Sequence, residues 1–189
     1  MNDKILLILD LDETLLHASA EKLPQECDYQ VFNYFIYKRP GLDTFLTTCA
    51  RHFELAVWSS ASNDYVSQVV SALFPPEIPL RFVWSRSRCT PFLLAVQDEH
   101  GFYNLDYSSS YEYAKRLKKV RRGGFTLQKM LIVDDTPAKV LHNYGNAIYI
   151  KPFYGDPADT ELDKLGNYLL ELKDVENVRT IEKRNWRHF

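Results

Sequence analysis

Two pairs of acidic residues, each directly after a run of aliphatic side chains, are the residues of this chain best suited to chemistry. Asp10 and Asp12 form the first pair, in the segment ILDLDETL at 8–15. Two carboxylates one residue apart suit phosphoryl transfer by covalent catalysis, in which one carboxylate attacks phosphorus. The other carboxyl group protonates the leaving oxygen and then activates the attacking water. Taken alone, the pair could also be two solvent-exposed acids in a turn.

Asp134 and Asp135 form the second pair, in the segment LIVDDTP at 131–137. Mg2+ prefers a few carboxylates, a phosphate oxygen and several retained waters in octahedral geometry. Asp10 and Asp135 can supply the protein's share of such a shell. Without a cation between them, two carboxylates would repel a phosphate of charge about −2. The two pairs together therefore favour a Mg2+-dependent phosphoryl-transfer site over two exposed turns.

Ser59 and Lys115 are the further candidates for binding phosphate. Ser59 follows a predicted strand, where its hydroxyl and nearby backbone N–H groups could hold phosphoryl oxygens. Ser60 beside it leaves the register open, and serines are common in such loops. Lys115 begins the basic run KRLKKVRR at 115–122. Most of this run is expected on a solvated helix face, but an early lysine could reach the phosphate; spacing alone does not select one.

The elements that must position these residues alternate as short apolar runs and longer amphipathic stretches, which indicates βα units and an α/β fold with a parallel sheet. The predicted strands are 4–9, 53–58, 81–84, 129–133 and 147–150, with part of a hairpin at 31–37. The predicted helices are 42–52, 63–73, 111–120, 137–142 and 160–172. The segment 85–110 is predicted to be a hairpin-like insertion with turn residues at 98–101. Open α/β sheets bind ligands at the carboxyl ends of their strands, where both acidic pairs would lie.

Composition bounds the class of protein. The chain has 189 residues, 46% hydrophobic and 25% charged, with a net charge of −2. We therefore expect one globular domain and neither nucleic acid nor a membrane as direct partner. Cys27, Cys49 and Cys89 form no metal or disulfide pattern, and the apolar run at 5–9 is too short for a signal peptide or membrane span. The expected location is cytoplasmic or nuclear, in a reducing environment.

The chain resembles, over nearly its whole length, the FCP/SCP family of small CTD phosphatases (NLI-interacting-factor-like) within the haloacid dehalogenase (HAD) superfamily. The segments that carry the resemblance are DLDETLLH at 10–17, KRPG at 38–41, DDTPA at 134–138 and DTEL at 159–162. The first is similar to the family's signature DLDETLxH and is highly specific. The resemblance implies a HAD-like Rossmannoid parallel sheet with helices on both faces, small β-hairpin insertions and no large cap domain. It also implies a single domain over 1–189, with an insertion at about 85–111.

The resemblance implies a role for each acidic residue. Asp10 matches the nucleophile, which is also a metal ligand. Asp12 matches the general acid/base, whose backbone carbonyl would also bind the metal. Asp135 matches a metal ligand that is often Asn in the family, and Asp134 supports the site beside it. The implied cofactor is Mg2+.

The resemblance also assigns the phosphate-binding residues. Ser59 falls at the family's second motif, because Tyr65 then aligns without a gap; Ser60 stays an alternative. Lys115, in YAKRL at 113–117, is similar to the third-motif lysine of YVKDL. Arg39 is expected near the phosphate entrance.

The expected substrate is large, because the sequence leaves no room for a cap domain that would cover the site. Only a flap hairpin and one helix fit between Asp10 and Ser59, and the later insertion is about 25 residues, a hairpin's length. An open site predicts a monomeric protein serine/threonine phosphatase acting on exposed phosphorylated segments. The insertion is longer, and the stretch 21–30 shorter, than in the small CTD phosphatases, which indicates a rebuilt groove and an altered flap. Aromatic residues of the insertion could line the groove or the core: Phe92, Phe102, Tyr103, Tyr107, Tyr111 and Tyr113.

Other functions stay open. A small-molecule or nucleic-acid 3′-end phosphatase would use the same chemistry. A non-catalytic binding or scaffold protein is the alternative from another class, and the intact set Asp10, Asp12, Lys115 and Asp135 argues against it. A dehalogenase is disfavoured because Asp12 has no necessary role in that reaction.

Overall fold

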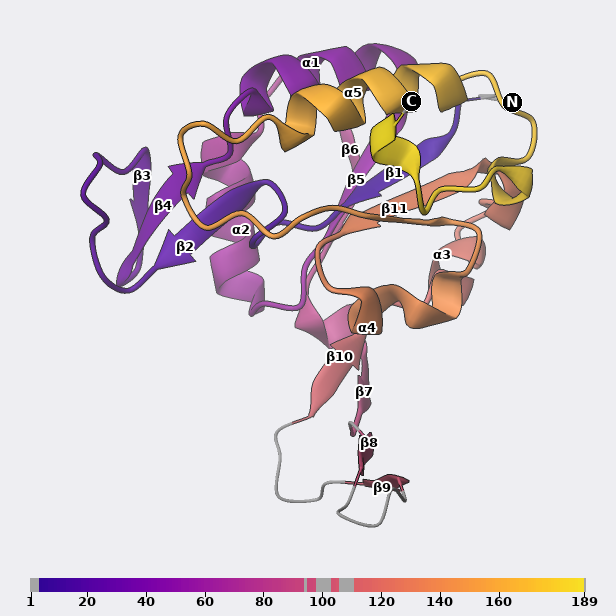
Figure 1. Ribbon diagram of the computed structural model, residues 1–189, viewed down its shortest axis with the longest axis horizontal. Helices are drawn as coiled ribbons and strands as arrows, with labels where there is room; N and C mark the ends of the chain where they lie inside the picture. The colour runs from indigo at the N-terminus through magenta and orange to yellow at the C-terminus, as the bar shows by residue number, and fades with distance from the viewer. Residues whose placement is uncertain (1–3, 94, 98–102, 106–110, 189) are drawn as a thin grey trace.

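The computed structural model of the chain describes residues 4–93, 95–97, 103–105 and 111–188. Its centre is a five-stranded sheet in the order β12–β11–β1–β5–β6, in which every neighbouring pair is parallel (Figure 1). The strands are β1 (Leu6–Leu9), β5 (Glu54–Trp58), β6 (Leu80–Trp84), β11 (Met130–Asp134) and β12 (Ala147–Tyr149). The predicted α/β class with a parallel sheet is confirmed.

The central strands read as continuous apolar runs because both faces of the sheet are buried. In β1, Leu7 and Leu9 pack into one hydrophobic cluster, whereas Leu6 and Ile8 pack into the cluster on the other face. All four residues have no exposed surface. This alternation follows from the two-residue period of a strand. β1 therefore lies between two hydrophobic cores, one on each face of the sheet.

Helices cover both faces of the sheet. The helices α1 (Leu42–His52), α2 (Asn63–Leu73) and α5 (Glu161–Leu172) pack into the larger cluster, and α3 (Lys118–Arg121) and α4 (Pro137–Val140) into the smaller one. Figure 1 shows α1 and α5 side by side above the sheet. Short 3-10 turns complete the chain: η1 (Arg86–Arg88), η2 (Leu127–Lys129), η3 (Leu141–Asn143), η4 (Val178–Thr180) and η5 (Trp186–His188). In the part of the chain that the structure describes, no helix is long and apolar enough to cross a bilayer.

Two antiparallel arms project from the sheet in different directions (Figure 1). The first, called the flap, has the strand order β2–β4–β3, with β2 (Leu16–Ser19), β3 (Tyr29–Val31) and β4 (Tyr34–Lys38). The second, called the insertion arm, pairs β7 (Thr90–Phe92) with β10 (Glu112–Ala114), and β8 (Ala95–Gln97) with β9 (Tyr103–Leu105). Both predicted hairpins are therefore present, whereas the predicted turn at 98–101 lies outside the described residues.

The helix predicted over 111–120 is wrong. Residues Glu112–Ala114 form β10, and only Lys118–Arg121 is helical. The apolar spacing of Leu117 and Val120 extends over a single turn of helix. Before it, pairing with β7 satisfies the backbone of β10, and such tertiary pairing overrides a weak helical pattern.

Candidate active site

The candidate residues lie at the carboxyl ends of three neighbouring strands. Asp10 follows β1, and its backbone N–H donates to the carbonyl of Val133 in β11 at 3.1 Å. Asp134 is the last residue of β11. Ser59 follows β5, and its N–H donates to the carbonyl of Trp84 in β6 at 2.9 Å. Because β11, β1 and β5 are adjacent and parallel, they deliver these side chains to one edge of the sheet.

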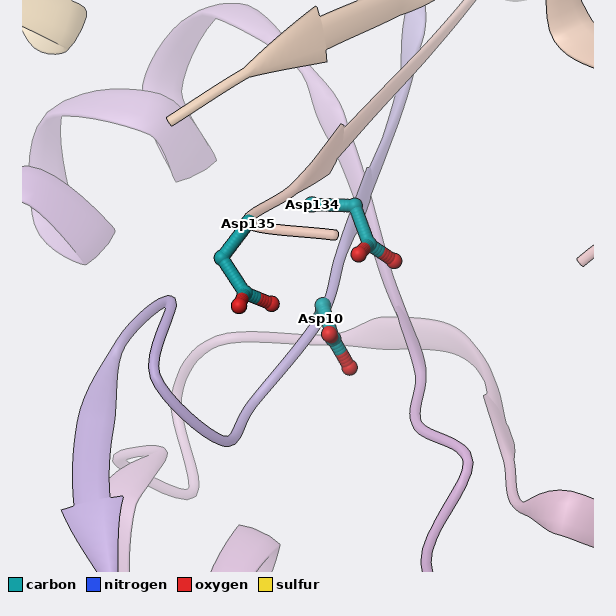
Figure 2. A group of neighbouring side chains, drawn as sticks. All are labelled: Asp10, Asp134 and Asp135. Carbon is teal, nitrogen blue, oxygen red and sulfur yellow. The ribbon is translucent and has the colours of Figure 1, made fainter. Parts of the chain in front are cut away.

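Three carboxylates gather at this edge. One oxygen from each of Asp10, Asp134 and Asp135 lies within 4.8 Å of the other two. Figure 2 shows the three side chains grouped together. Asp10 Oδ2 and Asp135 Oδ1 are buried without a hydrogen-bond partner in the described part of the chain. Buried, unsatisfied carboxylate oxygens are costly unless a donor or cation meets them. This donor set therefore fits a hard divalent cation.

Lys115 brings a positive charge into direct contact with the acids of the site. Its Nζ lies 2.7 Å from Asp10 Oδ1 and 2.6 Å from Asp134 Oδ2, and its side chain is fully buried. Burial alone would lower the pKa of Lys115, but the charges of Asp10 and Asp134 outweigh burial and raise it. Lys115 is therefore an ammonium ion at neutral pH, which offsets part of the repulsion between the acids.

The backbone of Lys115 is fixed from both sides although it belongs to no helix or strand. Its N–H donates to the carbonyl of Lys139 at 2.7 Å, and its carbonyl accepts from Nδ2 of Asn143 at 2.6 Å. The lysine thus enters the site from the segment between β10 and α3, rather than from the early part of a helix.

Asp12 lies beside the acidic cluster in a different environment. Its Oδ1 accepts a hydrogen bond from the Tyr65 hydroxyl at 2.5 Å, and its Oδ2 lies 3.4 Å from Ser59 Oγ. Burial raises the pKa of Asp12 despite the opposing Tyr65 hydrogen bond. A carboxyl group that is protonated more readily suits a general acid. Tyr65 is not among the predicted site residues; its only signal in the sequence is that it aligns Ser59 with the family's second motif. It lies in the first turn of α2.

The two serines are distinguished by their surroundings. Ser59 is fully buried, and its Oγ accepts from the N–H of Ala61 at 3.0 Å. Ser60 is half-buried, and its carbonyl accepts from Nε of Arg86 at 2.7 Å. Of the two serines, Ser59 is therefore the one whose hydroxyl lies beside Asp12.

Ser59→Ala is therefore expected to lower kcat/KM for an aryl phosphate by about 10²-fold, the scale of losing one donor to a reacting oxyanion. Ser60→Ala, the matched control, is expected to stay close to the unmodified protein. Steady-state kinetics of the two variants in parallel check the assignment. A larger loss in Ser60→Ala would reverse it.

Arg39, expected near the phosphate entrance, has its guanidinium engaged by partners within the protein. Its guanidinium donates from Nε and Nη2 to the two carboxylate oxygens of Asp159, at 2.9 and 2.8 Å. Its Nη1 donates to the carbonyl of Thr14 at 3.0 Å, and the side chain is fully buried. Arg39 therefore links Asp159 to the backbone of Thr14, and the structure supports this linking role rather than contact with phosphate.

An open pocket of about 350 Å³ lies beside Asp12. Its lining residues are Asp12, Glu13, Ala18, Phe32, Tyr34, Ala61, Ser62, Tyr65 and Arg86. Its aromatic wall thus comes from the flap and α2. Of the insertion's aromatic residues, Phe92, Tyr111 and Tyr113 do not line this pocket. Phe102 and Tyr107 lie outside the described residues, and only the backbone of Tyr103 is described.

Comparison with known proteins gives one family match. The family model for NLI interacting factor-like phosphatases matches residues 5–179. The chain is 28% identical to the Drosophila melanogaster CTD nuclear envelope phosphatase 1 homolog over 194 residues, which cover 95% of this chain and 72% of that protein. It is 27% identical to human carboxy-terminal domain RNA polymerase II polypeptide A small phosphatase 1 over 187 residues, or 95% of this chain and 64% of that one.

Solved structures agree on the fold. The structure of Fcp1, an essential RNA polymerase II CTD phosphatase, superposes with a TM-score of 0.67 at 15% identity, covering 94% of this chain and 69% of that chain. A putative β-phosphoglucomutase from Thermotoga maritima superposes with a TM-score of 0.55 at 11% identity, covering 89% of this chain and 99% of that one.

Proposed function

Because the chain belongs to the NLI interacting factor-like phosphatase family, we propose that it is a Mg2+-dependent protein serine/threonine phosphatase that works through an aspartyl-phosphate intermediate. The observation that carries the proposal is the environment of Asp10. Its buried carboxylate pairs with Lys115 through Oδ1, while Oδ2 has no partner among the described residues. An oriented carboxylate with one free oxygen, beside a fixed ammonium group, suits nucleophilic attack on phosphorus.

In the first step an Asp10 oxygen attacks phosphorus, and the bond from phosphorus to the leaving oxygen breaks. The Asp12 carboxyl group donates its proton to that oxygen. Lys115 and the Ser59 hydroxyl stabilise the charge on the phosphoryl oxygens. In the second step Asp12, now a carboxylate, takes a proton from water as the water oxygen attacks phosphorus. The bond to Asp10 breaks, and inorganic phosphate leaves.

Asp10, Asp135 and the backbone carbonyl of Asp12 would hold Mg2+, with Asp134 supporting the site beside them. When bound, the ion would neutralise charge between the acids and the substrate phosphate and polarise the phosphoryl group. The free oxygens of Asp10 and Asp135 support this assignment.

Removal of the metal is expected to stop turnover. After treatment with EDTA the protein should be inactive, and added Mg2+ should restore activity. Asp135→Ala should raise the Mg2+ concentration needed for half-maximal activity by more than about 100-fold. Losing a residue that only supports a metal ligand already costs roughly 10- to 100-fold in metal affinity, and Asp135 is proposed to be a ligand itself. Glu171→Ala, which removes an exposed acid of α5, is the control. Full activity in EDTA would contradict the metal assignment.

A protein substrate is supported by the open pocket beside Asp12, where the flap residues Phe32 and Tyr34 are 57% and 42% exposed. Exposed aromatic side chains next to a reaction centre suit a polypeptide. The relatives named above are CTD and nuclear envelope phosphatases, which supports phosphoserine or phosphothreonine segments as substrates. We propose that the chain acts as a monomer in the cytoplasm or nucleus.

The test compares kcat/KM for phosphoserine and phosphothreonine peptides with kcat/KM for nucleotides and sugar phosphates, all with Mg2+. The peptides are expected to be the better substrates. Equal or better turnover of the metabolites would favour a small-molecule or nucleic-acid-end phosphatase. Failure of all of them, with an aryl phosphate also unhydrolysed, would favour a non-catalytic binding protein.

A further inference from the structure

The KRPG and DTEL segments meet in a buried ion pair that the proposed chemistry does not use. Arg39, from KRPG, makes a two-bond pair with Asp159, from DTEL. Asp159 Oδ1 also accepts from the N–H of Glu161 at 2.9 Å, which fixes the carboxylate at the start of α5. Burial would raise the pKa of Asp159, but the hydrogen bonds from Arg39 and the N–H of Glu161 hold it below its ordinary value. The guanidinium is thus oriented by a fixed carboxylate.

Two further hydrogen bonds of Arg39, one from its side chain and one from its backbone N–H, reach the turn that follows the catalytic aspartates. Glu13 in that turn has φ of 57°, in the left-handed region that residues other than glycine seldom adopt. Such a conformation persists only where its surroundings determine it. The turn is short, since the N–H of Leu15 already donates back to the carbonyl of Leu11 at 2.8 Å.

Three successive carbonyls of this turn are held from outside it. The Glu13 carbonyl accepts from the N–H of Phe153 at 2.8 Å. The Thr14 carbonyl accepts from Arg39 Nη1 at 3.0 Å, and the Leu15 carbonyl accepts from the Arg39 N–H at 2.9 Å. Arg39 therefore makes two of the three contacts, one through its side chain.

We propose that Arg39 is a positioning residue for Asp12, the proposed general acid, with Asp159 as its anchor. The pair holds the strained turn directly after Asp12, while Tyr65 holds the carboxyl group itself at 2.5 Å. Without the side chain of Arg39 the turn relaxes, and the carboxyl group shifts relative to the leaving oxygen. The inference rests on the proposed function, because it explains what positions Asp12 as the general acid of that reaction.

The leaving group gives a selective readout. A serine side chain leaves as a strongly basic alkoxide and needs the proton from Asp12, whereas 4-nitrophenolate leaves without help. General acid–base catalysis contributes about 10²- to 10⁴-fold, and a displaced acid loses part of this for the basic leaving group alone. Partial unfolding lowers both activities by the same factor, so the ratio of the two kcat/KM values does not depend on the fraction folded.

The experiment measures kcat/KM of Arg39→Lys with a phosphoserine peptide and with 4-nitrophenyl phosphate. Lysine keeps the charge, but its donors all start from one nitrogen. They cannot reproduce the planar fork by which Arg39 bonds both Asp159 oxygens and the Thr14 carbonyl. We expect the loss with the peptide to exceed the loss with the aryl phosphate by at least about tenfold, a fraction of the general-acid contribution. Asp159→Asn, which removes the anchoring charge, should change the ratio in the same direction.

Arg187→Gln is the matched control. Arg187 also joins a carboxylate at the start of α5 to a backbone carbonyl: Nε donates to Glu161 at 2.5 Å and Nη2 to the Tyr149 carbonyl at 3.0 Å. Its carbonyl partner lies in β12, not in the catalytic turn, so the peptide-to-aryl ratio should stay that of the unmodified protein.

An unchanged ratio in Arg39→Lys and Asp159→Asn, or the same change in Arg187→Gln, would overturn the positioning role. So would the failure of both variants to yield soluble protein, because Arg39 would then serve the fold as a whole. If the unmodified protein hydrolyses neither substrate, the proposed function itself fails. The two failures are therefore distinguishable.

Discussion

Asp10→Asn is expected to lower kcat for aryl and peptide phosphates by about 10⁴- to 10⁶-fold, the order of loss found when a covalent nucleophile is removed from a hydrolase. An amide cannot attack phosphorus, so no phosphoenzyme forms. The substitution is nearly isosteric, and Lys115 keeps its 2.6 Å contact with Asp134. The fold and the phosphate site should therefore survive.

Two measurements separate this loss from a general defect. Acid-quenched reactions with labelled substrate should yield phosphorylated protein from the unmodified chain and none from Asp10→Asn. Inorganic phosphate should still bind Asp10→Asn when titrated calorimetrically with Mg2+ present. Asp43→Asn, which alters an exposed acid paired with Lys38, is the control and should turn over normally. Measurable phosphoenzyme from Asp10→Asn would show that another residue is the nucleophile.

Much of the fold could be predicted because its local signals agree with the tertiary structure. The predicted bounds of α1 and α2 coincide with the observed ones. Gly41, whose φ of 78° suits glycine, is the residue directly before α1. Pro75 follows two residues after Leu73, the last residue of α2. The aliphatic runs before Asp10 and Asp134 could be interpreted as strands because strands buried on both faces have few polar residues. A parallel sheet then brings their carboxyl ends together.

The contacts that shape the site could not be predicted in the same way, since their partners are far apart in sequence. The sequence predicts Lys115 on a helix, but β10 pairs with β7, and the ammonium group reaches the acids from the segment that follows β10. Arg39 was expected at the phosphate, yet its partner Asp159 lies 120 residues along the chain. In the sequence Tyr65 serves only to align Ser59, whereas in the structure its hydroxyl contacts Asp12. No local pattern encodes these pairings.

Lys115→Met is expected to lower kcat/KM by about 10³- to 10⁵-fold, the scale reported for a cationic group that stabilises a phosphoryl-transfer transition state. Methionine approximates the length of the lysine stem and removes only the charge and the donors. The phosphoryl oxygens then lose the ammonium group that contacts Asp10, in a site that already holds three carboxylates. Lys118→Met, at an exposed position of the same basic run, should leave the rate unchanged.

The same substitution also removes the only described ion-pair partner of two buried carboxylates, Asp10 and Asp134. Removing one partner of a buried pair costs about 3–5 kcal/mol, so lost activity could reflect unfolding. The double variant Lys115→Met, Asp134→Asn separates the two causes, because the amide removes one uncompensated charge. Urea denaturation should show part of the stability restored, while kcat/KM stays low. Recovery of activity together with stability would mean that Lys115 supports the fold and contributes little to the transfer of phosphate.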